Sequence, residues 1–157
     1  MPKKKFALFS TAGTAALALG ATALLTAPAH AEPGKVIDLD VGNDGVVKTD
    51  VGEHGLSVGD EFLYADKLYQ GGKQVGKDGS SCQVTQLVGE KTTTNCVLSV
   101  QLPDGQITAQ SLWTKGDDTV RMAVTGVTGA YRGASGELSC YDIQTPHETY
   151  RITLDKP

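Results

Sequence analysis

Apolar and polar residues alternate along most of the chain after residue 34, in short runs separated by turn-forming residues. A period of two is typical of β-strands with one buried face, and no stretch of this region keeps a helical period for three turns. The turns are rich in glycine, proline, asparagine and aspartate. The predicted strands are Lys35–Val41, Glu61–Tyr69, Ser80–Val88, Thr92–Gln101, Gln106–Thr114, Thr119–Val127, Ser135–Ile143 and Glu148–Leu154.

Eight short strands with short connections and no helix predict an all-β fold, either a closed antiparallel barrel or a sandwich. We favour an eight-stranded antiparallel closed barrel with little or no helix, because eight strands just suffice to enclose side chains or one small ligand. The longest irregular stretch, residues 42–59, is a candidate flap. The glycine-rich run Val124–Leu138 predicts a corner between two strands, since it has no GK[ST], no G-x-G-x-x-G and no following helix.

The first 31 residues have the pattern of a secretory signal peptide. Lys3–Lys5 form a basic start, Phe6–Leu25 is mostly apolar, and Ala29–Ala31 offers an A-x-A cleavage site. A retained N-terminal membrane anchor is the alternative interpretation. We therefore expect residues 1–31 to be removed and residues 32–157 to form one domain, secreted from a bacterium.

The charge of the remaining chain limits its partners. Without the three lysines of the N-terminal segment, 11 basic residues stand against 18 acidic ones, a net charge of −7. This balance argues against nucleic acid or an anionic membrane surface as a partner. No second long apolar segment follows, so no membrane contact is expected after cleavage. Neither a CxxC pair nor a histidine cluster occurs, so no metal and no cofactor are expected.

Three cysteines are found in this chain, Cys82, Cys96 and Cys140. If the hairpin around Gly89 pairs residue 82 with residue 96, both sulfurs lie on one face of adjacent strands. An oxidising compartment favours a Cys82–Cys96 disulfide, and two reduced, buried cysteines are the alternative. Cys140 is then left over.

One predicted strand places a carboxylate among apolar residues. In Glu61–Tyr69, the residues Phe62, Tyr64, Asp66 and Leu68 share one face. Burial of Asp66 there would raise its pKa and suit it to acid–base work or to hydrogen-bonding a polar ligand atom. The alternative is a solvated Asp66 at the barrel rim. The only tryptophan, Trp113, belongs to the inward face of its own strand.

Other candidate groups carry weaker signals. In Lys35–Val41, alternation directs the apolar residues to the core and both Asp38 and Asp40 to solvent. The nucleophile motif G-x-S-x-G is absent, and His54 and His147 have no partners in the sequence pattern. Hydrolase chemistry therefore has no support.

Two motifs resemble those of the allene oxide cyclase and dirigent proteins. Gly59-Asp60, Ala65–Tyr69 and Gly71 are similar to the "GD…NKLY.G" segment of the cyclases and to a related dirigent segment with aspartate at the place of Asp66. Val75-Gly76 fits the "VG" that follows in both. Ala123–Gly136 is similar to their shared "VTGGTG.F.GA.G" signature. The likeness covers residues 35–154 in the right order and spacing, and we interpret the chain as a bacterial exported member of this superfamily.

The resemblance implies an eight-stranded barrel with an apolar cavity, often a homotrimer. The catalytic glutamate of the cyclases falls on Asp38 and a neighbouring asparagine on Asp40, which reverses the orientation expected from alternation. A second asparagine falls on Asp66, a cavity cysteine on Cys82 and a cavity tyrosine on Trp113. The cyclases' Ser-Pro pair has no counterpart near residues 45–47, so allene oxide is not the expected substrate.

Three functions remain open from the sequence. The first is binding of a small apolar molecule in the cavity without turnover, with Phe62, Tyr64 and Trp113 as walls and Asp40 near the ligand. The second is a cofactor-free cyclase or isomerase, or a dirigent-type stereo-directing protein, with Asp38 or Asp66 handling a proton. The third is a structural barrel filled by side chains. A cavity below about 100 Å³ would rule out the first two, because ligand pockets usually measure several hundred.

Overall fold

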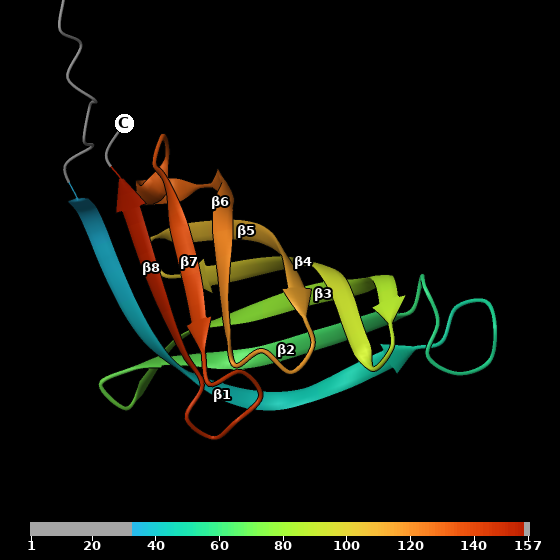
Figure 1. The fold of residues 1–157 in the computed structure, drawn as a ribbon. Helices are drawn as coiled ribbons and strands as arrows, with labels where there is room; N and C mark the ends of the chain where they lie inside the picture. Colours follow the sequence, from blue (N-terminus) through green and yellow to red (C-terminus); the bar gives the residue numbers. More distant parts are fainter. Residues whose placement is uncertain (1–32, 156–157) are drawn as a thin grey trace, which may run out of the picture.

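The computed structural model describes residues 33–155, which form an eight-stranded closed antiparallel β-barrel (Figure 1). The predicted signal peptide, residues 1–31, lies outside the described residues. The strands are β1 (Pro33–Thr49), β2 (Glu61–Gln70), β3 (Lys73–Val88), β4 (Lys91–Leu102), β5 (Gly105–Thr114), β6 (Thr119–Val127), β7 (Ser135–Tyr141) and β8 (Thr149–Asp155).

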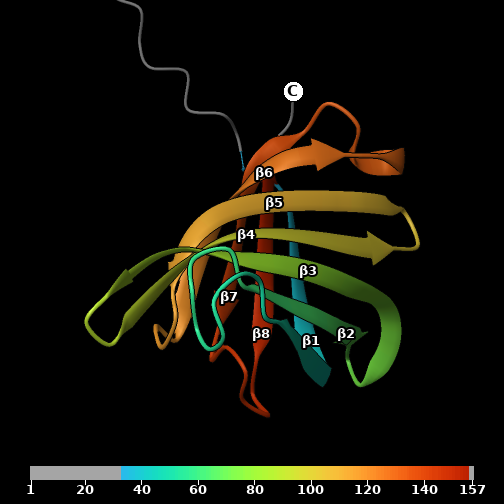
Figure 2. The same cartoon turned by 90° about the vertical axis from the view of Figure 1, so that its right-hand side faces the viewer.

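Every strand pairs with the next one along the chain, and β8 closes the barrel against β1. The two views in Figures 1 and 2 show this simple winding, with the long, curved β1 adjoining both β2 and β8. Closure leaves no free sheet edge in the barrel. The helical structure among residues 33–155 is the short 3₁₀ helix η1 (Gly129–Tyr131), and no helix there is long and apolar enough to cross a membrane. The predicted all-β barrel is confirmed.

Alternation places the core inside the barrel. In β4, every second residue from Thr92 to Leu102 is buried, and the residues between them are partly or fully exposed. The same period runs through β2 and β8, so the interior is built of one face of each strand. The most deeply buried apolar side chains are Leu68, Val84, Val100, Ile107, Ala109, Leu138 and Ile152.

Two strands are longer than the pattern predicts. β1 continues to Thr49 through an irregularity in its pairing with β2 between Asn43 and Val46, so the irregular part of the candidate flap is shorter than expected. β3 begins at Lys73 rather than at Ser80. Glycine weakens a strand signal, but a Cβ at Gly76 would collide with the Gln101 carbonyl oxygen, so close strand approach requires glycine there.

The β3–β4 hairpin carries the predicted disulfide. Cys82 lies opposite Cys96, and their sulfurs are joined. The predicted register holds through Val84 opposite Thr94, and it then shifts by one residue at a bulge beside Thr85. Cys140, on β7, is a buried free thiol.

The glycine-rich run forms the predicted corner between β6 and β7. Gly129 has a φ of +62°, and a Cβ there would overlap the Asp104 carbonyl oxygen. The backbone N–H of Ala130 donates to that same oxygen at 2.8 Å. The glycine therefore permits the close packing of this corner against the β4–β5 turn.

Candidate functional site

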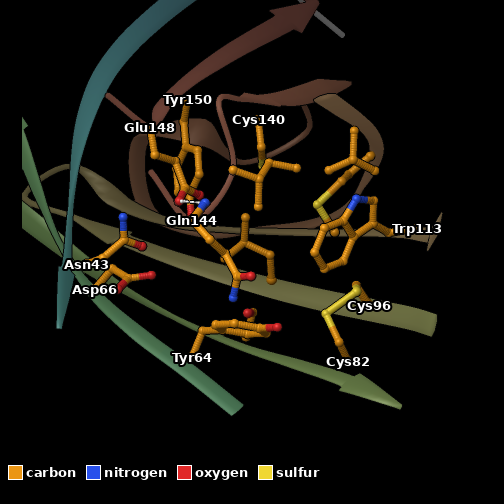
Figure 3. A pocket seen from close by; sticks show the side chains of 15 residues that line it. Asn43, Tyr64, Asp66, Cys82, Cys96, Trp113, Cys140, Gln144, Glu148 and Tyr150 are labelled. Atoms are coloured by element: carbon orange, nitrogen blue, oxygen red, sulfur yellow. Dashed lines mark hydrogen bonds between the residues drawn. A yellow bond between two sulfur atoms is a disulfide. The ribbon is translucent and has the colours of Figure 1, made fainter. Parts of the chain in front are cut away.

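The barrel encloses a cavity between the loop after β7 and the inner faces of β2–β6 and β8 (Figure 3). Its volume is about 60 Å³, which holds a few water molecules. The cavity has an acidic end and an apolar end. Its lining residues are Asn43, Tyr64, Asp66, Ser80, Cys82, Cys96, Leu98, Trp113, Val120, Met122, Cys140, Ile143, Gln144, Glu148 and Tyr150.

Asp66 supplies one carboxyl of the acidic end. Its strand position between inward-facing Tyr64 and Leu68 buries it, leaving 7% of the residue exposed. The backbone N–H of Asp44 donates to its Oδ1 at 2.9 Å. Burial raises the pKa of Asp66, the Asp44 N–H lowers it, and the nearby Asp44 charge raises it again. The net shift is upward, so this carboxyl holds its proton more readily than a surface aspartate does.

Glu148 supplies the second carboxyl, from the residue just before β8. It is 5% exposed, and the backbone N–H of Gln144 donates to its Oε2 at 2.7 Å. Burial raises the pKa of Glu148 and the charge of Asp66 raises it further, against the lowering effect of the Gln144 N–H and the Asn43 side chain. Two carboxyls that share a buried site and oppose each other's ionisation are suited to proton exchange.

Two tyrosines adjoin these acids. The Tyr64 hydroxyl is shielded from solvent, and no described residue meets hydrogen-bond geometry with it, although the Gln144 side chain lies near enough to lower the pKa of Tyr64. Tyr150 is 5% exposed, and its hydroxyl lies close enough to Glu148 to lower the pKa of that carboxyl. Burial raises the pKa of both tyrosines, so both hydroxyls remain protonated donors at neutral pH. A buried, unpartnered Tyr64 donor favours a polar ligand atom at this end.

The opposite end is lined by sulfur and aromatic surface. Figure 3 shows the Cys82–Cys96 disulfide and Trp113 on the side of the cavity away from Asp66. The indole N–H of Trp113 donates to the Asp117 carbonyl at 3.0 Å, which fixes the ring plane. Met122 adds a polarisable thioether. Sulfur and aromatic faces pack well against a flat, conjugated molecule.

Cys140 also lines the cavity, as a thiol rather than a thiolate. Burial raises its pKa, and the nearby carboxyls of Glu148 and Asp78 raise it further. Because the thiolate is the reactive form, Cys140 is not an activated nucleophile.

The loop between β7 and β8 lies beside the cavity and supplies Ile143 and Gln144 to its lining. Asp142 and Gln144 both have a left-handed backbone, with φ of 51° and 62°. The Asn43 side chain donates to the Thr145 carbonyl at 3.1 Å and ties this loop to β1. The Gln144 side chain extends into the cavity near the Tyr64 hydroxyl (Figure 3). A strained loop that carries a polar plug is a feature of ligand gates.

Four of the residues predicted from the sequence for the cavity meet in it: Tyr64, Asp66, Cys82 and Trp113. Asp66 is buried rather than solvated at a rim. Phe62 is also buried in the barrel, but it does not line the cavity. Its ring lies under the Lys115 ammonium, 3.7 Å from the ring centre.

The placement of Asp38 and Asp40 inside the cavity, which the resemblance implied, is wrong. Both side chains face outward, and Asp38 lies 3.5 Å from the exposed Arg151 guanidinium. The buried face of β1 is formed instead by Ile37, Leu39 and Val41. A shift of one residue would expose all three to water, so alternation decides the orientation.

Glu148, Tyr150, Asn43 and Gln144 are site residues that the sequence interpretation missed. A signal existed for the first two, because Glu148, Tyr150, Ile152 and Leu154 share one face of the predicted last strand. Asn43 is brought to the cavity by the irregular pairing of β1, and Gln144 by loop conformation. Neither feature has a periodic signature.

The described residues offer no set of metal ligands. Among residues 33–155, no three side chains of His, Cys, Asp or Glu converge in a way that could hold a metal ion. The functional groups of the cavity are two carboxyls, two phenols and a wall lined by sulfur atoms.

The described residues thus form a closed eight-stranded barrel with acidic and aromatic groups around an internal cavity. Residues 35–154 match the family model described as "Allene oxide cyclase barrel like domain". The chain belongs to this family, and the resemblance stated from its motifs is confirmed.

Solved structures give a closer comparison. A pyocyanin demethylase is 40% identical, with a TM-score of 0.71 over 76% of this chain and 99% of the other. An exo-specific intermolecular Diels-Alderase is 22% identical, with a TM-score of 0.61 over 77% and 98%. A pterocarpan synthase dirigent protein is 17% identical, with a TM-score of 0.59 over 80% and 97%. The last two show the fold alone, and a search of curated proteins returned no match.

Proposed function

We propose that this protein binds a flat, N-methylated heteroaromatic molecule of the pyocyanin type in its barrel cavity and acts on it as a demethylase. The observation that carries the proposal is the pairing of two buried carboxyls, Asp66 and Glu148, with a sulfur and aromatic wall at the other end of one cavity. The 40% identity to a pyocyanin demethylase, over nearly all of that chain, supports the same substrate class.

The two ends of the cavity suit the two parts of such a molecule. A conjugated ring system would pack against Trp113, Met122 and the disulfide, where dispersion and sulfur–aromatic contacts favour it. The cationic, N-methylated edge would face Asp66 and Glu148, since no Lys, Arg or His lines the cavity. The unpartnered Tyr64 hydroxyl would donate to a ring oxygen.

The raised pKa values of Asp66 and Glu148 define their proposed roles. A carboxyl that holds its proton closer to neutral pH can both give and take a proton during one reaction cycle. The demethylation balances with water and the substrate alone: the oxidised ring takes up the two electrons of a methyl C–H bond, water adds to the resulting methylene carbon, and formaldehyde leaves the reduced, demethylated ring. We assign the proton transfers of these steps to the pair, with Glu148 oriented by the Gln144 N–H and Asp66 by the Asp44 N–H.

The size of the cavity requires a conformational step. The cavity volume of about 60 Å³ is below the limit of about 100 Å³ given above for a ligand pocket. By itself, this volume favours a barrel filled by side chains. A tricyclic ligand therefore needs Gln144 to leave the cavity first. The unpartnered Tyr64 hydroxyl and the exposed position of the loop 142–147 favour such an opening.

The single tryptophan makes binding measurable. Pyocyanin is titrated into the protein and the fluorescence of Trp113 is recorded, and the N-demethylated product is then sought by mass spectrometry. Saturable quenching together with product formation is expected. The variants Asp66→Asn and Glu148→Gln are expected to retain quenching and lose most of the product, whereas the exposed Asp118→Asn is the control.

The outcomes separate the remaining functions. Saturable binding without product would favour a ligand-binding barrel, and absence of quenching would favour a filled, structural one. A cofactor-free cyclase or isomerase, or a dirigent-type protein, remains the alternative enzyme or stereo-directing function. The neighbours of those classes share the fold at 22% identity or less, so they add no argument about chemistry.

We also propose that the protein acts outside the cell as a homotrimer. The basic and apolar N-terminal segment supports export. Exposed apolar side chains on the outer faces of β2, β4 and β5, namely Leu63, Val97 and Leu112, support self-association. Mass spectrometry of the secreted chain would locate the cleavage site, and light scattering would give the number of subunits.

A further inference from the structure

We propose that Asp78 is a positioning residue of the candidate site: its buried carboxyl lies beside Asp66 and Tyr150, and the negative charge that it can gain makes the already ionised cavity acids take up a proton more readily. This inference rests on the proposed function, because it concerns the acids assigned to the substrate. Asp78 itself does not line the cavity, so it acts through its neighbours.

The pairing of β2 with β3 brings the two aspartates together. Asp66 and Asp78 are directly opposite partners in this antiparallel pair, and both are buried, at 7% and 8% exposure. Side chains of opposite partners point to the same face, with Cβ atoms typically about 5 Å apart. On the other side, the partner of Asp78 in β4 is the apolar Val100.

Asp78 lacks the partners that a buried charge requires. Both of its carboxyl oxygens are shielded from solvent, and no described residue donates to them in good hydrogen-bond geometry, although the Tyr150 hydroxyl and the Asp66 backbone N–H lie near enough to lower the pKa of Asp78. A buried carboxylate is normally paired or hydrogen-bonded, since an unpaired charge carries a large desolvation penalty. Exceptions of this kind are rare in native proteins and concentrate at functional groups.

The groups that face Asp78 come from three other strands or their ends, and none of them is a cation. They are Asp66 on β2, Cys140 on β7, and Tyr150 and Glu148 at the start of β8. Burial and the charges of Asp66 and Glu148 raise the pKa of Asp78 to about 7, although the Tyr150 hydroxyl and the Asp66 backbone N–H lower it. Asp78 therefore changes charge near neutral pH.

A change of charge at Asp78 is transmitted to the cavity. Asp66 and Glu148 ionise first, while Asp78 is still protonated, and their negative charges then hold the proton on Asp78 until the pH approaches about 7. When Asp78 loses its proton, its negative charge opposes ionisation of Asp66 and Glu148 across the low-dielectric interior. The three carboxyls thus titrate as a coupled set, with Asp78 as the member that never meets the ligand.

The test is a ¹³C NMR titration of the carboxyl groups between pH 3 and 9, which needs no ligand. In the natural protein we expect Asp78 to titrate near pH 7 and the curves of Asp66 and Glu148 to show a second inflection there. In Asp78→Asn we expect that inflection to vanish while the main midpoints of Asp66 and Glu148 stay in place, because Asp78 is still protonated when they ionise. Asp118→Asn is the matched control, because Asp118 is exposed, and its curves should match the natural protein.

Titration of Asp78 in the ordinary acidic range would overturn the inference, as would unchanged Asp66 and Glu148 curves in Asp78→Asn. If the variant does not fold, the curves of the natural protein decide the matter by themselves.

A pyocyanin titration from pH 5 to 9 separates this inference from the proposed function. Absence of binding at every pH would contradict the proposed function, and the NMR result would still decide the role of Asp78. If pyocyanin binds, its Kd should show a step near pH 7 that Asp78→Asn lacks, and a step retained in that variant counts against the inference.

Discussion

In the proposed function, ligand access depends on Gln144. Its side chain extends into the cavity near Tyr64, and its backbone has a φ of 62°, a conformation that costs an ordinary residue about 1 kcal/mol. The strain is maintained because the Gln144 N–H donates to the buried Glu148 carboxyl. Gln144 therefore links the loop beside the cavity to the Glu148 carboxyl.

Replacing Gln144 by glycine is expected to open the cavity without unfolding the protein. Glycine adopts the positive φ without strain, and its greater freedom in the unfolded chain offsets most of that gain, so stability should change by less than about 1 kcal/mol. Stopped-flow quenching of Trp113 by pyocyanin should show an association several-fold faster than in the natural protein.

Asp142→Gly is the matched control, since Asp142 also has a positive φ, of 51°, but does not line the cavity. This variant relieves backbone strain in the same loop and leaves the Gln144 side chain in the cavity. Equal acceleration by both variants would show that loop strain, rather than the Gln144 side chain, limits access.

At the scale of elements, the β3–β4 hairpin joins a structural and a functional role. The Cys82–Cys96 bond links opposite partners on the inner face, and the same sulfurs line the cavity. A cross-link of this kind restricts the unfolded chain, while its position gives the ligand wall a fixed shape.

Removal of this disulfide is expected to destabilise the barrel. The variant Cys82→Ala/Cys96→Ala should lose ~2–3 kcal/mol of unfolding free energy, which lowers Tm by roughly 10 °C. Thermal unfolding with and without a reductant measures the effect. The natural protein and Cys140→Ala should both lose stability on reduction, and the double variant should not. Insensitivity of the natural protein to reduction would contradict the prediction.

The connection between β1 and β2 is held by a single buried carboxylate. Asp60 accepts hydrogen bonds from the backbone N–H groups of Val51 at 2.9 Å and Ser57 at 3.2 Å, and it pairs with Lys48 at 3.1 Å. The Val51 N–H is the main reason that the pKa of Asp60 is lowered to about 2, with Lys48 and Ser57 contributing in the same direction.

The variant Asp60→Asn is expected to release residues 50–59 without opening the barrel. The Val51 and Ser57 amides should exchange their hydrogens faster, and limited proteolysis should cut this segment first. Because the folded pKa is below the ordinary value of 3.8, the stabilisation by Asp60 is present above pH 4 and is lost as the pH falls through about 2. Asp50→Asn is the control, and equal protection of the segment in both variants would argue against this role.

At the scale of the whole molecule, the barrel concentrates negative charge in its interior. Asp66, Asp78 and Glu148 are all buried and all have raised pKa values, and no basic residue lines the cavity between them. A carboxyl with a raised folded pKa binds more protons in the folded state than in the unfolded one. Its presence therefore lowers stability as the pH rises from about 4 towards the folded pKa.

We expect the natural protein to unfold at a lower temperature at pH 8 than at pH 5. Asp78 should contribute most to this difference, because its pKa is raised to about 7 in the folded protein. By linkage, its full ionisation would lower the free energy of unfolding by ~4 kcal/mol. Asp78→Asn should reduce the difference between the two Tm values and leave a smaller one from Asp66 and Glu148. Calorimetry at both pH values measures it, and an unaltered difference in the variant would contradict the prediction.

Much of the molecule could be predicted from local patterns. Period-two alternation indicated all eight strands and placed Tyr64, Asp66 and Trp113 on the inner face, and it also oriented Asp38 and Asp40 correctly. The error at these two aspartates came from transferring a role across the family. Alternation was the better guide because the burial of Ile37, Leu39 and Val41 outweighs any preference at a single polar position.

The sequence by itself determined the barrel, the strand faces and the pairing of Cys82 with Cys96, because each depends on spacing between neighbours in the chain or in one hairpin. Only the tertiary structure decided which groups share the cavity. Asp66, Asp78 and Glu148 come from β2, β3 and the start of β8, and closure of the barrel brings them together. Their raised pKa values follow from that shared burial, and the position of Gln144 follows from a loop conformation that no periodic pattern encodes.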